Sequence, residues 1–198
     1  MFMRGFLLLL LLSETIDGES LRFIHSSEQG FDTSCGLATL ACLIDRYWGV
    51  PTDERSLIET YLVNKRAAED LTISFADMAW ILNAKGFVWK AYRMSFDQLE
   101  QAAAAYAPMI IHYDKPEGHF ALLISARDGE LVIGDPAEGT ILRGREYFES
   151  RWSGAVLAAV KPNGTLNEEA LDAAVLWAQG RSALLDKSAR VSADLIAR

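Results

Sequence analysis

The hydrophobic and polar positions of this chain follow two different periods, and the change comes near Tyr106. Before that residue, apolar side chains recur at helical spacing in segments that open with Ser, Thr or Asp. Ser74 and Ser95 are each followed three residues later by an acidic or amide side chain, which predicts capping boxes. The pattern predicts helices over residues 35–47, 51–67, 74–86 and 95–106, and a strand over residues 87–93.

Beyond Tyr106 the chain contains short apolar runs separated by turn residues, as in an antiparallel sheet. Asp128-Gly129 is a typical hairpin turn between two of these runs. Helices followed by paired strands predict an α+β fold, with N-terminal helices packed on a C-terminal antiparallel sheet. The expected strands cover residues 108–114, 119–126, 130–135, 140–144 and 154–160, and residues 145–152 form a short helix.

The two ends of the chain differ from the domain between them, which is expected to cover residues 21–161. Residues 1–20 contain Arg4 followed by the leucine-rich stretch Gly5–Leu12, typical of an export signal or N-terminal anchor. A wrongly assigned start of translation is the alternative. Residues 162–198 form a mostly helical tail. Its apolar side chains would either pack on the domain or form a docking face for a partner: Leu171, Val175, Leu176, Leu184 and Leu185.

Composition and charge narrow the class of protein. The 198 residues are 51% hydrophobic and 23% charged, as in one folded domain with short extensions. The formal net charge of −8 argues against a nucleic-acid partner and against a strongly acidic substrate, unless basic residues gather locally. Cys35 and Cys42 are seven residues apart, about 10 Å along a helix, which is too far for a disulfide. Two cysteines make no zinc site by themselves, and no metal or cofactor is expected.

Cys35 lies at the start of the first expected helix, a position that makes a thiol more reactive. The positive end of the helix dipole favours the thiolate, and Gly36 leaves the sulfur uncrowded. A cysteine that only fills space in the core is the alternative. That second interpretation is preferred for Cys42, which has apolar neighbours on both sides.

A cysteine nucleophile needs a base, and the chain has three histidines. His119 opens a strand directly after a turn, at a sheet edge where its imidazole can meet a helix start. His112 lies inside a strand and is interpreted as a structural residue, and His25 precedes the first helix. The sequence therefore favours His119 as the base.

Two more side chains complete a candidate site. Asp135 ends the strand that would pair with the strand of His119, so its carboxylate could orient the imidazole. His119 lies nine residues before the first residue of the hairpin turn and Asp135 six after its last, so the two are loosely matched. An ordinary Asp-Pro turn is the alternative. Gln29, six residues before Cys35, could fold back and donate its side-chain amide to an oxyanion.

Three motifs together resemble those of the bacteriocin-leader-processing cysteine peptidases, family thirty-nine of the cysteine peptidases. They are QGFDTSCGLA (residues 29–38), GHFALL (residues 118–123) and DPAEG (residues 135–139). The resemblance extends over about residues 23–160. It implies a papain-like fold.

The resemblance also implies a role for each candidate residue. Cys35 would be the nucleophile and His119 the general base and acid, while Asp135 would orient His119. Gln29 would donate to the oxyanion. Members of the family cut after small residues, typically a glycine pair, so the substrate is expected to be a protein or peptide with a Gly-Gly-like site.

The best-known members are N-terminal domains of ABC exporters, whereas this sequence is similar in layout to stand-alone exported peptidases. The amyloid-assembly operons of some pseudomonads carry such a peptidase. We therefore expect a cysteine endopeptidase that is periplasmic or exported, with or without an inner-membrane anchor, and that works in secretion or surface-fibre assembly. A secretion-system partner would bind the tail. One alternative is a silent pseudo-peptidase that binds a leader without cutting it, and another is a transglutaminase- or acyltransferase-like enzyme on the same core.

Overall fold

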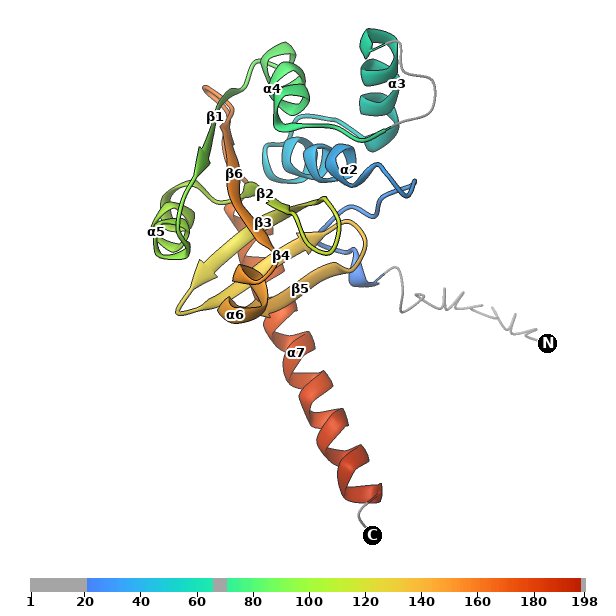
Figure 1. Cartoon of the computed structure of the whole chain (residues 1–198), viewed down its shortest axis with the longest axis vertical. Coiled ribbons are helices and arrows are strands. Elements are labelled where there is room, and N and C mark those ends of the chain that lie inside the picture. The colour runs from blue at the N-terminus through green and yellow to red at the C-terminus, as the bar shows by residue number, and fades with distance from the viewer. Residues whose placement is uncertain (1–20, 66–70, 197–198) are drawn as a thin grey trace, which may run out of the picture.

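One antiparallel sheet organises the molecule (Figure 1). The structure is a computed structural model that describes residues 21–65 and 71–196, so the predicted export signal lies outside the described residues. The six strands lie in the spatial order β1-β6-β2-β3-β4-β5, with every neighbouring pair antiparallel. They are β1 (Val88–Arg93), β2 (Met109–Tyr113), β3 (His119–Arg127), β4 (Glu130–Asp135), β5 (Gly139–Gly144) and β6 (Trp152–Val160).

The larger core lies between one face of the sheet and several helices. These helices are α2 (Cys35–Cys42), which continues as the π-helical turn η1 (Leu43–Tyr47), α3 (Glu54–Lys65), α4 (Phe75–Ala84) and α7 (Glu168–Ile196). Leu37 and Leu40 of α2 are fully buried with Leu122 of β3. Seven of the eight residues of α2 are buried, which explains why apolar residues occupy more than one of its faces.

The opposite face of the sheet carries a second, smaller core. Helices α5 (Phe96–Tyr106) and α6 (Arg145–Glu149) cover this face. Their buried side chains Phe96, Leu99 and Phe148 pack with Ile111 and Leu123 of the strands. The sheet is therefore covered on both sides, as the apolar runs of its central strands require.

The two predicted capping boxes are confirmed. The Ser74 hydroxyl accepts the N–H of Asp77, whose carboxylate accepts the N–H of Ser74 at 2.9 Å. Ser95 and Gln98 make the same reciprocal pair at the start of α5. The predicted hairpin is confirmed as well, since Asp128 and Gly129 have φ angles of 53° and 78°, the positive values that a tight hairpin turn needs.

The register between β3 and β4 contains a shift that decides where Asp135 points. Near the turn, Arg127 lies opposite Glu130, but beyond an irregularity between Leu123 and Ser125 the pairing moves by one residue. Leu122 consequently lies opposite Gly134. Asp135, the next residue, is thereby placed two residues from His119 along the hairpin and on the same face of the sheet. Without the shift, Asp135 would face the other side.

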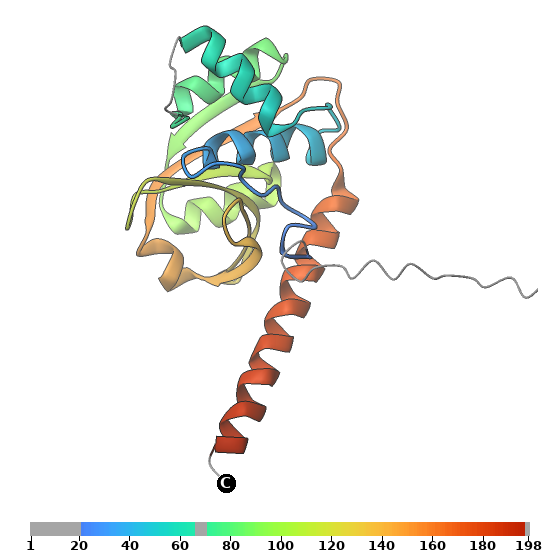
Figure 2. The ribbon, with the colours of Figure 1, turned by 90° about the vertical axis from the view of Figure 1, so that its right-hand side faces the viewer.

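Helix α7 packs on the domain with its first turns and then extends away from it (Figure 2). Leu171 and Val175 pack against the larger core, whereas Leu176, Leu184 and Leu185 are exposed. The packing of the tail on the domain is thus limited to its first turns. Among the described residues, no helix has the length and apolar character needed to cross a membrane.

Candidate active site

Cys35 is the first residue of α2, where the chain enters the larger core. The Ser34 hydroxyl forms hydrogen bonds with the backbone of Phe31 and does not cap α2. The helix is held in place instead by the burial of its residues after Cys35. The Cys35 thiol is free and half-buried. As the first helical residue, Cys35 also has an N–H without a carbonyl partner inside the helix.

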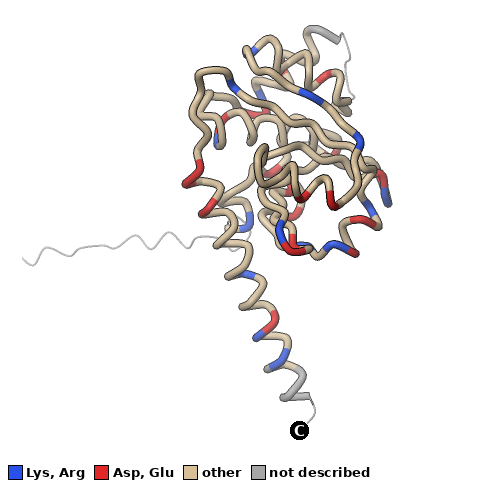
Figure 3. The backbone as a smooth tube through the Cα atoms, turned by 90° about the vertical axis from the view of Figure 1, so that its left-hand side faces the viewer, with Lys and Arg blue, Asp and Glu red and all other residues tan. Residues whose placement is uncertain are grey.

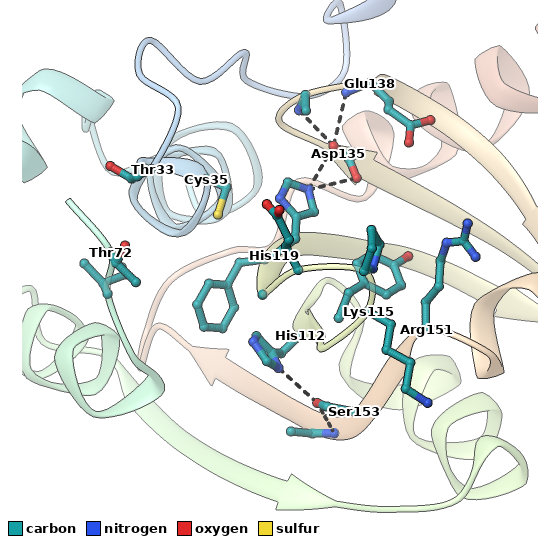
Figure 4. Close-up of a pocket in the computed structure, with 18 of the residues that line it drawn as sticks. Thr33, Cys35, Thr72, His112, Lys115, His119, Asp135, Glu138, Arg151 and Ser153 are labelled. Carbon is teal, nitrogen blue, oxygen red and sulfur yellow. Dashed lines mark hydrogen bonds and ion pairs between the residues drawn. The ribbon is translucent and has the colours of Figure 1, made fainter. Parts of the chain in front are cut away.

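His119 begins β3, Asp135 ends β4, and their side chains meet. The His119 Nε2 atom lies 3.1 Å from each carboxylate oxygen of Asp135. Asp135 is only 5% exposed, and its Oδ1 accepts the N–H groups of Ala137 at 2.8 Å and Glu138 at 3.1 Å. These bonds fix the carboxylate and, through it, the imidazole. Since Nε2 faces Asp135, Nδ1 is left for Cys35, whose sulfur lies on the opposite side of the ring (Figure 4).

Cys35 and His119 titrate as a coupled pair. Burial by itself would raise the pKa of the Cys35 thiol, but hydrogen bonds with His119 and with the backbone of Phe120 outweigh it and lower that pKa. Burial would lower the pKa of His119, but hydrogen bonds with Asp135 and Cys35 raise it. Together these shifts favour a thiolate–imidazolium pair. Cys42 behaves in the opposite way, since complete burial raises its pKa.

The paired side chains open into a cavity of about 1010 Å³. The start of α2 and residues 72–75 line the cavity on the Cys35 side. The β2–β3 loop and the region from β5 to β6 line it beyond His119. The Tyr113 ring lies nearly parallel to the His119 ring, with centroids 6.3 Å apart.

Gln29 lies near the site, but its side chain does not face the cavity. Its backbone N–H donates to the Pro136 carbonyl at 3.0 Å, which ties the loop before α2 to the turn after Asp135. Its side-chain Nε2 donates to the carbonyls of Phe31 at 2.9 Å and Asp32 at 3.2 Å. The side-chain Oε1 is buried without a hydrogen-bond partner among the described residues.

Several cavity residues were not selected from the sequence. His112 lines the same cavity as His119, with its Nδ1 3.2 Å from the Ser153 hydroxyl and its ring next to those of Phe75 and Phe120. Four basic residues also line the cavity, and they come from β1, the β2–β3 loop, β5 and the start of β6: Arg93, Lys115, Arg143 and Arg151. No motif joins residues so far apart in sequence, and only the sheet order brings them together.

Charges elsewhere are mixed. Figure 3 shows acidic and basic residues interspersed over the domain and along the protruding part of α7. Within residues 21–65 and 71–196, no three His, Cys, Asp or Glu side chains group as metal ligands would.

Comparisons with known proteins agree with this geometry. The model of the Peptidase C39 family matches residues 24–164. The probable functional amyloid protease FapD of Pseudomonas aeruginosa is 30% identical over 142 residues, which cover 70% of this chain and 62% of FapD. The chain thus spans about three fifths of the length of this curated relative.

Two solved peptidase structures have the same fold. The peptidase domain of Streptococcus ComA, a bi-functional ABC transporter, aligns with a TM-score of 0.59 at 19% identity, covering 68% of this chain and 96% of that domain. A double glycine motif protease from an AMS/PCAT transporter, solved in complex with the leader peptide, aligns with a TM-score of 0.53 at 22% identity. The alignment covers 68% of this chain and 89% of that protease. The predicted papain-like α+β fold is confirmed.

Proposed function

The chain belongs to the Peptidase C39 family, as its motifs predicted, and on this premise we propose that it is an endopeptidase acting on an exported protein or leader peptide. The class, a cysteine peptidase, follows from the family. The observation that carries the proposal is the arrangement of Cys35, His119 and Asp135 at the wall of a peptide-sized cavity.

In the first half of the reaction, the Cys35 thiolate attacks the carbonyl carbon of the scissile bond, and a sulfur–carbon bond forms. The carbonyl oxygen becomes an oxyanion, which the unpaired N–H of Cys35 can stabilise. The C–N bond then breaks, and the His119 imidazolium gives its proton to the departing amine. The product of this half is a thioester on Cys35 and a neutral His119.

In the second half, His119 takes a proton from water and the resulting hydroxide attacks the thioester. The carbon–sulfur bond breaks, the carboxyl product leaves, and the thiolate–imidazolium pair re-forms. Asp135 keeps the ring in place throughout, since its carboxylate stays bonded to Nε2 and to two backbone N–H groups. Asp135 is thus assigned a positioning role.

Gln29 is proposed as the second oxyanion donor. Its backbone is anchored beside the loop that holds Asp135, which supports the assignment. Its side-chain amide, however, donates to two backbone carbonyls, and the side chain must rotate away from them to reach an oxyanion. We infer that substrate binding causes this rotation.

Cleavage after small residues is supported by close packing beside Cys35. A Cβ atom on Gly36 would lie 2.6 Å from Cγ1 of Ile73, so the segment that forms one wall of the cavity lies directly against the start of α2. The rings of Phe75 and Phe120, with centroids 5.2 Å apart, continue that wall. We infer that this wall leaves a narrow passage with room only for glycine or another small residue just before the scissile bond.

The biological setting of the cut is inferred from relatives. FapD is named as a probable functional amyloid protease, and the double glycine motif protease from an AMS/PCAT transporter was solved in complex with the leader peptide. We therefore place this chain in secretion or surface-fibre assembly, outside the cytoplasm. The exposed end of α7 is the proposed contact for a secretion-system partner.

The test is cleavage of a flexible peptide that contains Gly-Gly, compared with the same peptide carrying Val just before the bond. The wild-type chain should cut the Gly peptide far faster, because a β-branched side chain cannot enter the narrow passage. Cys35→Ala should abolish cleavage, whereas Cys42→Ala, the matched cysteine control, should retain it. Equal cleavage of the two peptides would refute the narrow passage, and cleavage by Cys35→Ala would refute the mechanism.

The engagement of the Gln29 amide favours one second candidate, a pseudo-peptidase that holds a leader without cutting it. Binding of the Gly-Gly peptide without cleavage, retained in Cys35→Ala, would support this candidate. Cleavage that depends on Cys35 would exclude it.

A further inference from the structure

The large cavity carries a pair of basic side chains to which the proposed reaction assigns no role. Lys115 and Arg151 line the cavity on the far side of His119 from Cys35 (Figure 4). Asp32 lies at the other end, in the loop before α2. Beyond the catalytic side chains, the cavity lining therefore carries Lys115 and Arg151 together with the acidic residues Glu117 and Glu138.

Backbone contacts bring these two residues together from distant parts of the sequence. Lys115 is in the β2–β3 loop, and Arg151 follows α6. The N–H of Asp114 donates to the carbonyl of Arg151 at 3.0 Å, which fixes the loop against the start of β6. The two backbone segments that carry Lys115 and Arg151 are thus held next to each other.

Aromatic stacking preorganises the guanidinium of Arg151. It lies 4.1 Å from the centroid of the Tyr147 ring, and the guanidinium of Arg143 lies 4.9 Å from the same ring. A planar guanidinium held on an aromatic face loses less freedom when it binds a carboxylate. Tyr147 thus prepares Arg151 for a planar anionic partner.

Neither of the two cations is neutralised. Arg143 forms an ion pair with Glu138, and Asp135 is engaged by His119. Lys115 and Arg151, by contrast, make no ion pair with any residue in the described part of the chain. The fourth basic residue of the cavity, Arg93, donates to the backbone carbonyl of Ser153 at 2.7 Å, so its guanidinium is engaged by the protein.

We propose that Lys115 and Arg151 form a subsite for an acidic side chain, Asp or Glu, of the peptide substrate, close to the scissile bond. The inference rests on the proposed function only in taking a peptide as the ligand. A carboxylate would bind the stacked guanidinium of Arg151 and the ammonium of Lys115. This local attraction opposes the expectation, drawn from net charge, that acidic substrates are disfavoured.

The test uses a neutral Gly-Gly peptide in which a single Glu replaces Gln at each position in turn, on both sides of the bond. The wild-type chain should prefer Glu at one position or two adjacent ones, by about tenfold in kcat/KM, as expected for a charge-assisted hydrogen bond. The preference should weaken between low and high salt, because the subsite is open to solvent. Equal cleavage of the Glu and Gln peptides at every position would overturn the proposal.

Variants locate the effect. Arg151→Glu should reverse the preference, so that a Lys peptide is cut faster than the Glu peptide, and Lys115→Gln should reduce the Glu preference. Arg127→Gln, which removes an exposed cation outside the cavity, should leave the preference unchanged. A Glu preference that survives Arg151→Glu in a folded variant would contradict the assignment.

Binding separates this inference from the proposed function. Cys35→Ala should bind the Glu peptide more tightly than the Gln peptide, as measured by fluorescence anisotropy. If the wild-type chain cuts neither peptide but the binding preference persists, the endopeptidase proposal fails and the acidic subsite stands. If binding shows no preference, the subsite fails whatever the cleavage result.

Discussion

At the scale of single residues, the two cysteines provide the sharpest contrast. His119 and backbone groups lower the pKa of Cys35, whereas burial raises that of Cys42. We predict that iodoacetamide labels Cys35 much faster than Cys42 between about pH 5 and 8, where an ordinary thiol with a pKa near 8.5 is mostly protonated. Peptide mapping after timed labelling measures both rates. Equal rates, or faster labelling of native Cys42, would contradict the thiolate assignment.

The pH profile of cleavage should reflect both members of the pair. Activity needs the thiolate and the imidazolium together, so it rises with pH as Cys35 ionises and falls as His119 loses its proton. The pKa of Cys35 is lowered from 9.0 and that of His119 is raised from 6.5. The acid limb of kcat/KM should therefore lie below pH 9.0 and the alkaline limb above pH 6.5. Activity that is already lost at pH 6.5 on the alkaline side would be inconsistent with this pair.

Gln29 can be tested as an oxyanion donor. Gln29→Ala should preserve the fold and reduce kcat about a hundred- to a thousandfold, the usual cost of losing one such donor. Steady-state kinetics with a circular dichroism control measures this. A fully active variant would assign the role to another group. The sequence could place Gln29 near Cys35 from spacing alone, but not the bonds of its amide to Phe31 and Asp32, because loop conformation determines them.

At the scale of secondary structure, the start of α2 is sensitive to added volume. Gly36→Ala should lower the free energy of unfolding by about 1–3 kcal/mol, because the new Cβ would crowd Ile73 and Met78 in a packed core. Gly180→Ala, in open space on α7, is the matched control and should raise it by about 0.5–1 kcal/mol. Chemical denaturation of both variants measures the changes. The same sign for both would argue against the close packing.

Local signals predicted the elements better than they predicted the pairing between strands. Ser74 and Ser95 set the starts of α4 and α5 through contacts within one turn, so the sequence pattern identified them. The register shift in β3 has no comparable local signal in the sequence. The sequence left His119 and Asp135 loosely matched, and this shift is what aligns them.

At the scale of the whole molecule, composition was a poor guide to the cavity. The net charge of −8 is an average over the chain, whereas Lys115 and Arg151 line one cavity because the β2–β3 loop is bonded to the segment just before β6. The family and fold could be predicted from the sequence because the family's motifs are short and continuous. The shared position of Lys115 and Arg151 in the cavity could not be predicted, because the two residues come from separate segments.

Export concerns the whole molecule as well. Residues 1–23 fused to a reporter that is active only outside the cytoplasm should give activity, because Arg4 and the leucine-rich stretch Gly5–Leu12 have the character of an export signal. Replacing the leucine-rich stretch by polar residues should silence the reporter. A silent wild-type fusion beside a working control would indicate a cytoplasmic enzyme or a wrong start of translation.

The central claim is that Cys35 forms a covalent thioester with the substrate. The most direct measurement is intact-protein mass spectrometry after rapid acid quenching of the chain with a peptide ester that ends in Gly-Gly. We predict a mass increase equal to the acyl fragment, located on Cys35 by peptide mapping, present in Cys42→Ala and absent from Cys35→Ala. Product formation by Cys35→Ala, or an adduct on any other residue, would contradict the account.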